Sequence, residues 1–170
     1  RFEIGASVSL FDSDYGVPSR PGVDHHHGEE DEEGHGHGEA PVTIGLEQVR
    51  ADLRGEVEVG GGFLDTIRTR LGYADYEHIE FEGDRVRTVF STRGMEGRLE
   101  RVQADRGGWR GVSGAQFFTR DFAAVGAEAF VPPNETSQLG LFSLQEFGFG
   151  DLNLEGAGRY EHSRVSSEQV

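Results

Sequence analysis

The 170-residue chain contains no cysteine. Disulfide bridges and thiolate metal ligands are therefore excluded, and any metal site must use histidine, aspartate or glutamate, which suit borderline and hard divalent ions. Basic residues are also scarce, because 16 of them stand against 31 acidic residues and the formal net charge is -15. This balance argues against nucleic acid as a partner, since phosphate binding needs clustered Lys and Arg, and it favours cations.

Long apolar runs and catalytic motifs are absent from the sequence as well. No run of about 18 apolar residues occurs, so the sequence predicts no transmembrane helix, and we expect no signal peptide within the opening Arg1-Phe2-Glu3-Ile4. Since this opening already lies inside an alternating pattern, we expect the chain to be an internal piece of a longer protein. Gly60-Gly61-Gly62 lacks the Lys-Ser/Thr of a phosphate loop, and no nucleophile motif occurs, so we expect no enzyme.

Helical periodicity is scarce too, whereas alternation of apolar and polar residues runs through most of the chain. Residues 2–10, 49–57 and 152–160 alternate strictly, so that one side of each segment is apolar and the other polar or charged. The alternation over 67–73 is weaker, and the segments near 94–105, 109–120 and 138–149 are strand-like. We predict an all-β chain of about seven strands.

The connections between these segments fall into two kinds. Short glycine-rich connections lie at 60–62, 107–108 and 148–151, and longer ones lie at roughly 13–43, 80–93 and 121–137. Short and long connections alternate strictly along the chain. This order predicts an antiparallel up-and-down meander with tight turns at one end of the sheet and long loops at the other.

Three features favour a transmembrane β-barrel over a soluble β-sandwich, which remains the alternative. The clear strands are expected to have about ten residues or more, whereas strands usually have about five to six. Their polar sides carry charges of both signs, as the wet interior of a wide barrel does, and short turns opposite long loops are typical of outer-membrane barrels. The side chains expected to line the lumen are Arg50, Arg54, Glu56, Arg68, Arg70, Glu96, Arg98, Glu100, Glu155, Arg159 and Glu161.

Large aromatic residues are candidates for the girdles that outer-membrane barrels place at the two membrane interfaces. Ordinary packing along the strands is the alternative for each of them. These residues are Tyr73, Tyr76, Trp109, Phe142 and Tyr160.

Several phrases of the sequence are distinctive, above all SDYGVP at 13–18 and GAEAFVPP at 126–133, with IRTRLGYADYEHIEFEG at 67–83 between them. These phrases resemble the barrel of TonB-dependent outer-membrane receptors, and they are most similar to the branch associated with zinc uptake. The resemblance covers essentially the whole chain. It implies that residues 1–170 form a partial barrel of about seven strands, and that the plug domain and the other strands of a barrel of about 22 strands lie elsewhere.

The resemblance also implies a location and a set of partners. It places the protein in the bacterial outer membrane, in contact with lipid, and couples it through a missing N-terminal region to the TonB–ExbB–ExbD complex. The function implied is active uptake of a metal ion, with zinc as the first choice. Two alternatives stay open: a receptor of the same family for a siderophore or other metal chelate, and a soluble secreted β-sheet protein that binds metal.

The stretch DHHHGEEDEEGHGHGE, residues 24–39, holds five of the seven histidines. In the barrel interpretation, 13–43 is an external loop, and its imidazoles and carboxylates capture a metal ion. Imidazole suits Zn²⁺, Cu²⁺ and Ni²⁺ alike, so zinc rests on the resemblance. Binding weakens as the pH falls and imidazoles are protonated; adventitious binding is the alternative. The candidate ligands are Asp24, His25, His26, His27, Glu29, Glu30, Asp31, His35 and His37.

His78 is a further candidate metal ligand, inside the barrel mouth. Alternation places it on the same side of its strand as Tyr76 and Glu80. A polar residue at the rim is the alternative interpretation. His162, at the expected end of the last strand, is a weaker candidate.

Overall fold

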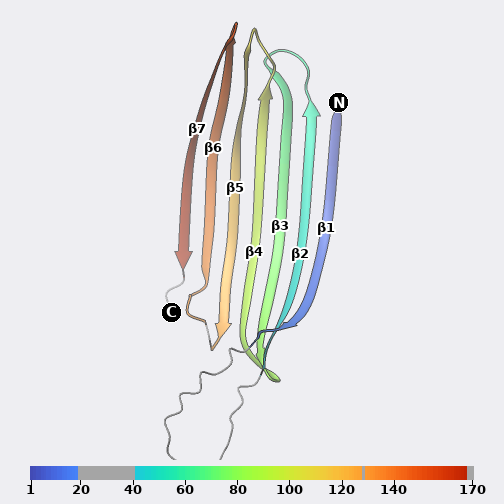
Figure 1. Ribbon diagram of the computed structural model, residues 1–170, viewed down its shortest axis with the longest axis vertical. Helices are drawn as coiled ribbons and strands as arrows, with labels where there is room; N and C mark the ends of the chain where they lie inside the picture. The colour runs from blue at the N-terminus through green and yellow to red at the C-terminus, as the bar shows by residue number, and fades with distance from the viewer. Residues whose placement is uncertain (19–40, 128, 168–170) are drawn as a thin grey trace, which may run out of the picture.

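The computed structural model describes residues 1–18, 41–127 and 129–167, and these residues form strands and turns alone (Figure 1). No helix in these ranges is long and apolar enough to cross a membrane. The strands have 15 to 19 residues each, well above the usual length. They are β1 (Phe2–Gly16), β2 (Val42–Glu58), β3 (Leu64–Glu82), β4 (Arg85–Gln103), β5 (Trp109–Gly126), β6 (Asn134–Phe149) and β7 (Leu152–Ser167).

The seven strands form one antiparallel sheet in the order β1-β2-β3-β4-β5-β6-β7, so each strand pairs with its neighbours in sequence. The predicted up-and-down meander is therefore confirmed. Figure 1 shows the strands as long ribbons that lie side by side, with β1 and β7 at the two opposite edges. Since these two strands do not pair with each other, the sheet is open in the described part of the chain.

All three connections that were predicted to be long are shorter in the structure. The expected long loop at 80–93 is absent, because β3 and β4 are joined directly by the turn 83–84. Gly83 has a φ of 59° and begins this two-residue turn, as Gly150 with 61° begins the turn 150–151. A glycine with positive φ at this place is what the tight turns of antiparallel hairpins require.

The expected loop 121–137 shrinks to 127–133, because β5 continues to Gly126 and β6 begins at Asn134. The expected loop 13–43 is likewise shorter, since β1 includes Ser13 to Gly16 and β2 begins at Val42. β7 continues to Ser167, so His162 does not end it. One end of the sheet carries the connections 17–41, 83–84 and 127–133. Long connections were predicted at this end, and two of the three, 17–41 and 127–133, are longer than a tight turn.

The pairing register separates the side chains of the whole sheet onto two faces. The side that carries Leu53, Leu71 and Leu99 is called the apolar face, and the side that carries Arg54, Arg70 and Arg98 the charged face. The three arginines lie in matching register positions of β2, β3 and β4, and Leu53 pairs with Leu71, whereas Leu99 lies two residues along β4 from the partner of Leu71. Because successive residues of a strand point to opposite sides, alternation in the sequence becomes segregation in the sheet.

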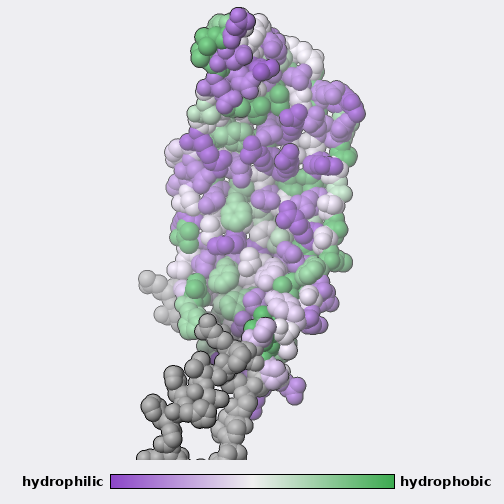
Figure 2. All heavy atoms as spheres, viewed as in Figure 1, coloured by the Kyte–Doolittle hydropathy of each residue, from purple (hydrophilic) through white to green (hydrophobic). Residues whose placement is uncertain are grey.

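The described residues enclose almost no hydrophobic core. Ala124 is the one buried hydrophobic residue among them, whereas Val8 and Leu10 on the apolar face are 72% and 76% exposed. Hydrophobic residues lie uncovered on the visible surface in Figure 2, next to hydrophilic ones. A single sheet has no second layer to pack against, so its stability rests on the backbone ladder and on contacts between neighbouring strands.

The apolar face carries a band of hydrophobic residues with a stepped lower boundary. Counted from the middle of each strand toward the 17–41 end, the last hydrophobic residue before the first charged one is Leu10 on β1, Val49 on β2, Tyr73 on β3, Met95 on β4, Phe117 on β5, Leu139 on β6 and Tyr160 on β7. Further hydrophobic residues lie beyond this boundary on the same face, such as Ile79, Phe81, Val89 and Val125. Leu10 pairs with Val49, but Val49 pairs with Asp75, and the boundary moves up again after β4 and after β6. The boundary thus moves by about one residue per strand.

Candidate functional site

The middle of the charged face is a network of ion pairs. Arg68 on β3 pairs with Glu56 on β2 at 2.8 Å, and Arg50 reaches Asp52 at 2.8 Å and Glu96 of β4 at 3.7 Å. These side chains are about half exposed, so each pair contributes little to stability by itself. All eleven residues predicted to line the lumen lie on this one face.

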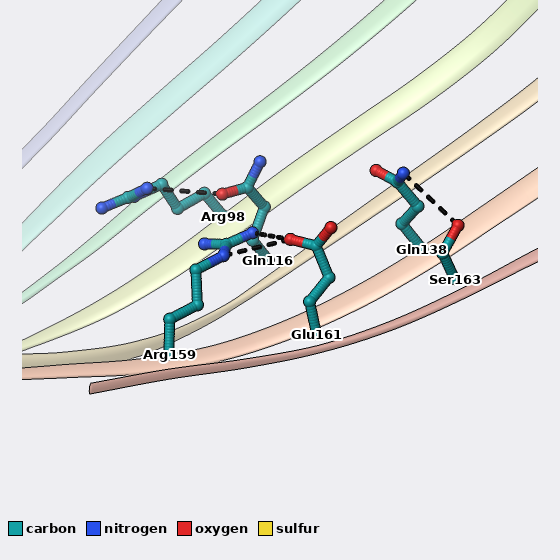
Figure 3. A network of polar contacts seen from close by, with 6 residues as sticks. All are labelled: Arg98, Gln116, Gln138, Arg159, Glu161 and Ser163. Carbon is teal, nitrogen blue, oxygen red and sulfur yellow. Dashed lines mark hydrogen bonds and ion pairs between the residues drawn. The ribbon is translucent and has the colours of Figure 1, made fainter.

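Arginine also orders the charged face between β4 and β7. Arg98 donates to Glu100 at 2.7 Å and to Gln116 of β5 at 3.4 Å, and its guanidinium lies 4.3 Å from the Phe142 ring centre. Arg159 pairs with Glu161 on β7 (Figure 3). Figure 3 shows these side chains standing on the same side of the sheet. The planar guanidinium group of arginine can contact a carboxylate at two points, whereas the ammonium group of lysine acts as a single point charge.

Toward the 17–41 end, the charged face holds the candidate ligand His78. Its Nδ1 lies 3.2 Å from the Tyr76 hydroxyl and its Nε2 lies 3.4 Å from Glu80 Oε1, so the three side chains share a face as predicted. The imidazole also contacts the Phe90 ring at 4.7 Å between centres. His78 and Glu80 form a half-buried nitrogen–oxygen donor pair, which is two ligands of the three or four that zinc takes.

A complete metal site is not formed by the described residues alone. Within 1–18, 41–127 and 129–167, no group of three or more histidine, aspartate or glutamate side chains is arranged to hold an ion. His162 lies on the apolar face opposite Leu139, away from His78 on the charged face. The other predicted ligands, Asp24, His25, His26, His27, Glu29, Glu30, Asp31, His35 and His37, lie outside the described residues.

The aromatic residues divide between the two faces, which corrects part of the girdle prediction. Tyr73, Trp109 and Tyr160 lie on the apolar face, but Tyr76 and Phe142 lie on the charged face, so the five residues cannot all belong to girdles on one face. Sequence reasoning missed Phe63 and Phe147, which contact Trp109 at 5.5 Å and 5.9 Å between ring centres.

The cluster around Trp109 marks the tight-turn end of the apolar face. The Trp109 Nε1–H donates to Gln145 at 2.9 Å, and Phe147 stacks on Phe149 at 6.5 Å. The Arg101 guanidinium lies 5.6 Å from the Phe63 ring centre. Trp109 combines a flat ring with one polar group, which suits a boundary between an apolar and an aqueous layer, and the phenylalanines add apolar rings beside it. The alternation of side chains along β5 and β6 puts Phe147 on the same face as Trp109. This alternation was the sequence signal that could have identified Phe147.

Glycine lets large rings lie across neighbouring strands on both faces. On the apolar face, a Cβ at Gly97 would lie 2.1 Å from the Phe117 ring, and on the charged face one at Gly114 would lie 2.5 Å from the Phe142 ring. The rings therefore cover the glycine backbone, which fills the surface of the sheet where a side chain is missing.

Neither a search of protein-family models nor a search of curated proteins finds a match to this chain.

Proposed function

We propose that the chain forms part of an outer-membrane β-barrel that takes up a divalent metal ion, with zinc as the cargo. The observation that carries the proposal is the tilted apolar band. The band drifts by about one residue per strand. With a rise of about 3.3 Å per residue and a strand spacing of about 4.8 Å, this drift corresponds to a strand tilt of about 35°. Strands of membrane barrels tilt by a similar angle.

The height of the band supports the same proposal. Apolar residues alternate with polar ones from Val49 to Val57 on β2 and from Leu152 to Tyr160 on β7. Each stretch is close to the roughly 9–11 residues with which a tilted strand crosses a bilayer. The aromatic cluster of Phe63, Trp109 and Phe147 lies at the tight-turn end, and the ion pair Arg93–Asp75 (3.0 Å) lies just beyond the band at the other. A soluble sheet would instead need a second layer over this face.

Metal as the cargo rests on the histidines and on the net charge. His78 and Glu80 point from one strand toward the same space on the charged face, which becomes the lumen in the proposed barrel. The sequence adds five histidines and their acidic neighbours at 24–39. In the proposal these residues capture the ion outside, and His78 with Glu80 holds it at the mouth on its way inward.

The test is a calorimetric zinc titration of the full-length protein in detergent. It compares the wild type with a variant in which His25, His26, His27, His35 and His37 are alanine, and with His78→Gln. We expect the five-histidine variant to lose the tightest zinc site and His78→Gln to lose a weaker one. Copper and nickel serve as competitors. Unchanged zinc binding in both variants would contradict metal capture by these residues and favour a metal chelate as the cargo.

A further inference from the structure

The apolar band contains a single charged side chain in the described strands, Arg101 on β4. Arg101 pairs in register with Ile67 of β3 and lies two residues from Leu99, so it belongs to the apolar face. From the band boundary to the tight-turn end, the other positions of this face in β1 to β7 carry uncharged side chains. A guanidinium on the lipid side of a barrel is costly at the midplane of the bilayer and much less so near an interface. The depth of Arg101 therefore decides what it can contact.

Arg101 reaches from the band to the tight-turn boundary. It lies six residues from Met95, which is about 20 Å along β4 and about 16 Å in height at the proposed tilt. Since the band of a membrane barrel is about 25 Å tall, its Cα lies about 9 Å inside the lower limit. The guanidinium lies 5.6 Å from the ring centre of Phe63, which precedes β3 at the tight turns. Its apolar stem thus stays in the band, while the charge reaches the depth of the lipid headgroups.

No carboxylate of the described ranges pairs with Arg101. Arg93 and Arg98 of the same strand both form ion pairs, whereas no Asp or Glu oxygen of these ranges lies within 4.0 Å of the Arg101 guanidinium. Arg106, in the turn after β4, donates to the backbone carbonyl of Gly62 at 3.3 Å and likewise has no carboxylate of the described ranges within that distance. Two guanidinium groups near the tight-turn end of this face therefore lack a contacting anion.

Small polar side chains continue the row of Arg101 across the next strands. Arg101 pairs with Ser113, Ser113 with Ser143, and Ser143 with Gly158. The two serine hydroxyls lie 2.8 Å apart, and the Gln145 Nε2–H donates to Ser143 at 3.0 Å. A Cβ added at Gly158 would meet nothing within 4 Å, so the row ends in open space. These five residues are called the polar notch.

Hydrophobic side chains border the polar notch on two sides. Leu99 and Leu141 lie two residues away toward the 17–41 end, and Trp109 and Phe147 lie toward the tight turns. A ligand that fills the notch must therefore offer an anion and hydrogen-bonding groups next to hydrocarbon. Phospholipids combine these properties, because their phosphate and headgroup stand at the end of acyl chains that can cover the two leucines.

Charge distinguishes the possible occupants of the polar notch. A second copy of this chain would bring its own Arg101 toward the first about a two-fold axis, and the two like charges would repel each other. A zwitterionic phospholipid would add an ammonium group next to Arg101 and Arg106, which already lack contacting carboxylates in the described ranges. An anionic phospholipid whose headgroup carries hydroxyls avoids both conflicts, since its hydroxyls can also bond with Ser113 and Ser143.

We propose that the polar notch binds the headgroup of an anionic, hydroxyl-bearing phospholipid such as phosphatidylglycerol, in the leaflet at the tight-turn end. The inference rests on the proposed function, because a membrane barrel is what turns this face toward lipid. The phosphate accepts hydrogen bonds from Arg101 and Arg106, the headgroup hydroxyls bond with Ser113 and Ser143, and the acyl chains lie along the band. The lipid thereby supplies the negative charge that the described strands do not place beside Arg101.

The test measures quenching of Trp109 fluorescence by brominated lipid in vesicles that contain the full-length protein. Trp109 is the single tryptophan of the chain, contacts Phe63 at 5.5 Å and donates to Gln145 of the polar notch at 2.9 Å. Tryptophans elsewhere in the protein are replaced by phenylalanine. Brominated phosphatidylglycerol and brominated phosphatidylethanolamine are compared as equal minor fractions of phosphatidylcholine vesicles. We expect phosphatidylglycerol to associate about fivefold more strongly, as an arginine at a lipid phosphate allows.

Substitutions assign this preference to the notch. Arg101→Gln is expected to abolish the fivefold preference and Arg101→Lys to keep part of it, while Ser113→Ala with Ser143→Ala lowers it about twofold. Arg164→Gln is the matched control, because Arg164 lies on the same face beyond the other boundary of the band. It is expected to leave the quenching of Trp109 unchanged. Equal association of the two lipids with the wild type, or a preference that survives Arg101→Gln, would overturn the proposal.

Two further outcomes concern other occupants. The preference is expected to persist when inorganic phosphate replaces chloride at equal ionic strength, because the acyl chains hold the lipid in place; its loss would overturn the phospholipid as the ligand. Trp109 that neither brominated lipid quenches would also overturn the proposal, since another polypeptide, such as a second copy, would then cover the notch.

The barrel itself is read from the same samples by heat-modifiable migration in detergent gels. A heat-modifiable protein whose Trp109 is quenched equally by both lipids overturns the headgroup site and keeps the barrel. A protein that is not heat-modifiable and shows no quenching contradicts the barrel, and the headgroup site falls with it.

Discussion

The two faces of the sheet are built from alternate residues of the same strands, yet they follow opposite rules. On the apolar face, large hydrophobic side chains such as Leu10 and Tyr160 stay exposed at 76% and 66%. On the charged face, half-exposed arginines are tied to carboxylates, as Arg68 is to Glu56. The chain has no lysine, so every one of these side-chain cations is a guanidinium. In the proposed barrel, this difference means that one face meets lipid and the other meets water.

The difference between the two faces is tested most strongly by placing a charge on the apolar face. Leu71→Arg puts a guanidinium in the middle of the apolar band, where it would cost about 2–4 kcal/mol in the free energy of unfolding if that face meets lipid. Ser7→Arg on the charged face, opposite Asp52, is the control and is expected to change the free energy by less than about 0.5 kcal/mol. Urea unfolding in lipid vesicles, followed by tryptophan fluorescence, measures both. Equal costs would contradict the assignment of the faces.

The next largest effect is expected at the glycines that lie under aromatic rings. Gly97→Val places a side chain where the Phe117 ring lies, and the forced shift of the ring costs about 1–3 kcal/mol. Gly156→Val on β7 is the control, because nothing lies within 4 Å of a Cβ there. The same unfolding assay compares them. If Gly156→Val is as costly as Gly97→Val, the contact with Phe117 is not the reason.

The aromatic cluster at the tight-turn end gives a smaller effect. Trp109→Ala removes the stack on Phe147 and the hydrogen bond to Gln145, and we expect a loss of about 1 kcal/mol beyond the lost surface area. Trp109→Phe keeps the ring contact and is expected to recover about half of that loss. With the single tryptophan removed, unfolding is followed by the heat-modifiable band on gels. A full loss in Trp109→Phe would show that the hydrogen bond dominates.

The smallest effect is expected from an isolated ion pair on the charged face. Arg159→Gln removes the pair with Glu161, and since both side chains are more than 40% exposed, the free energy of unfolding should change by less than about 1 kcal/mol. The effect should fall further at high salt. A large loss that salt does not change would mean that this pair is buried against another part of the protein.

The sequence could predict the strand number and the side of each charged residue, because alternation depends only on the period of two. It could not predict the length of the connection at 80–93. There the alternation weakens around Glu82 to Arg85, and the Gly83-Asp84 turn was overlooked although it repeats the Gly150-Asp151 pair. The neighbouring positions of Arg54, Arg70 and Arg98 could not be predicted either, because register depends on how far each strand slides against the next.

The metal site was predicted from composition, and composition gives donor types without positions. The structure brings His78 together with Glu80 and separates both from His162. Two histidines of similar chemistry thus lie on opposite faces. Even-numbered residues lie on the charged face in β3 and on the apolar face in β7. The residues of the tract at 24–39 stay predictions as ligands.

The measurement that tests the central claim most directly is fluorescence quenching at neighbouring positions on opposite faces. Single cysteines at Leu71 and at Arg70, labelled with a small fluorophore in the full-length protein, are compared in vesicles of brominated lipid and in buffer with iodide. The account predicts that bromine quenches the label at Leu71, whereas iodide quenches the label at Arg70. Equal quenching by iodide at both positions would contradict a lipid-facing apolar surface and favour a sheet that lies in water.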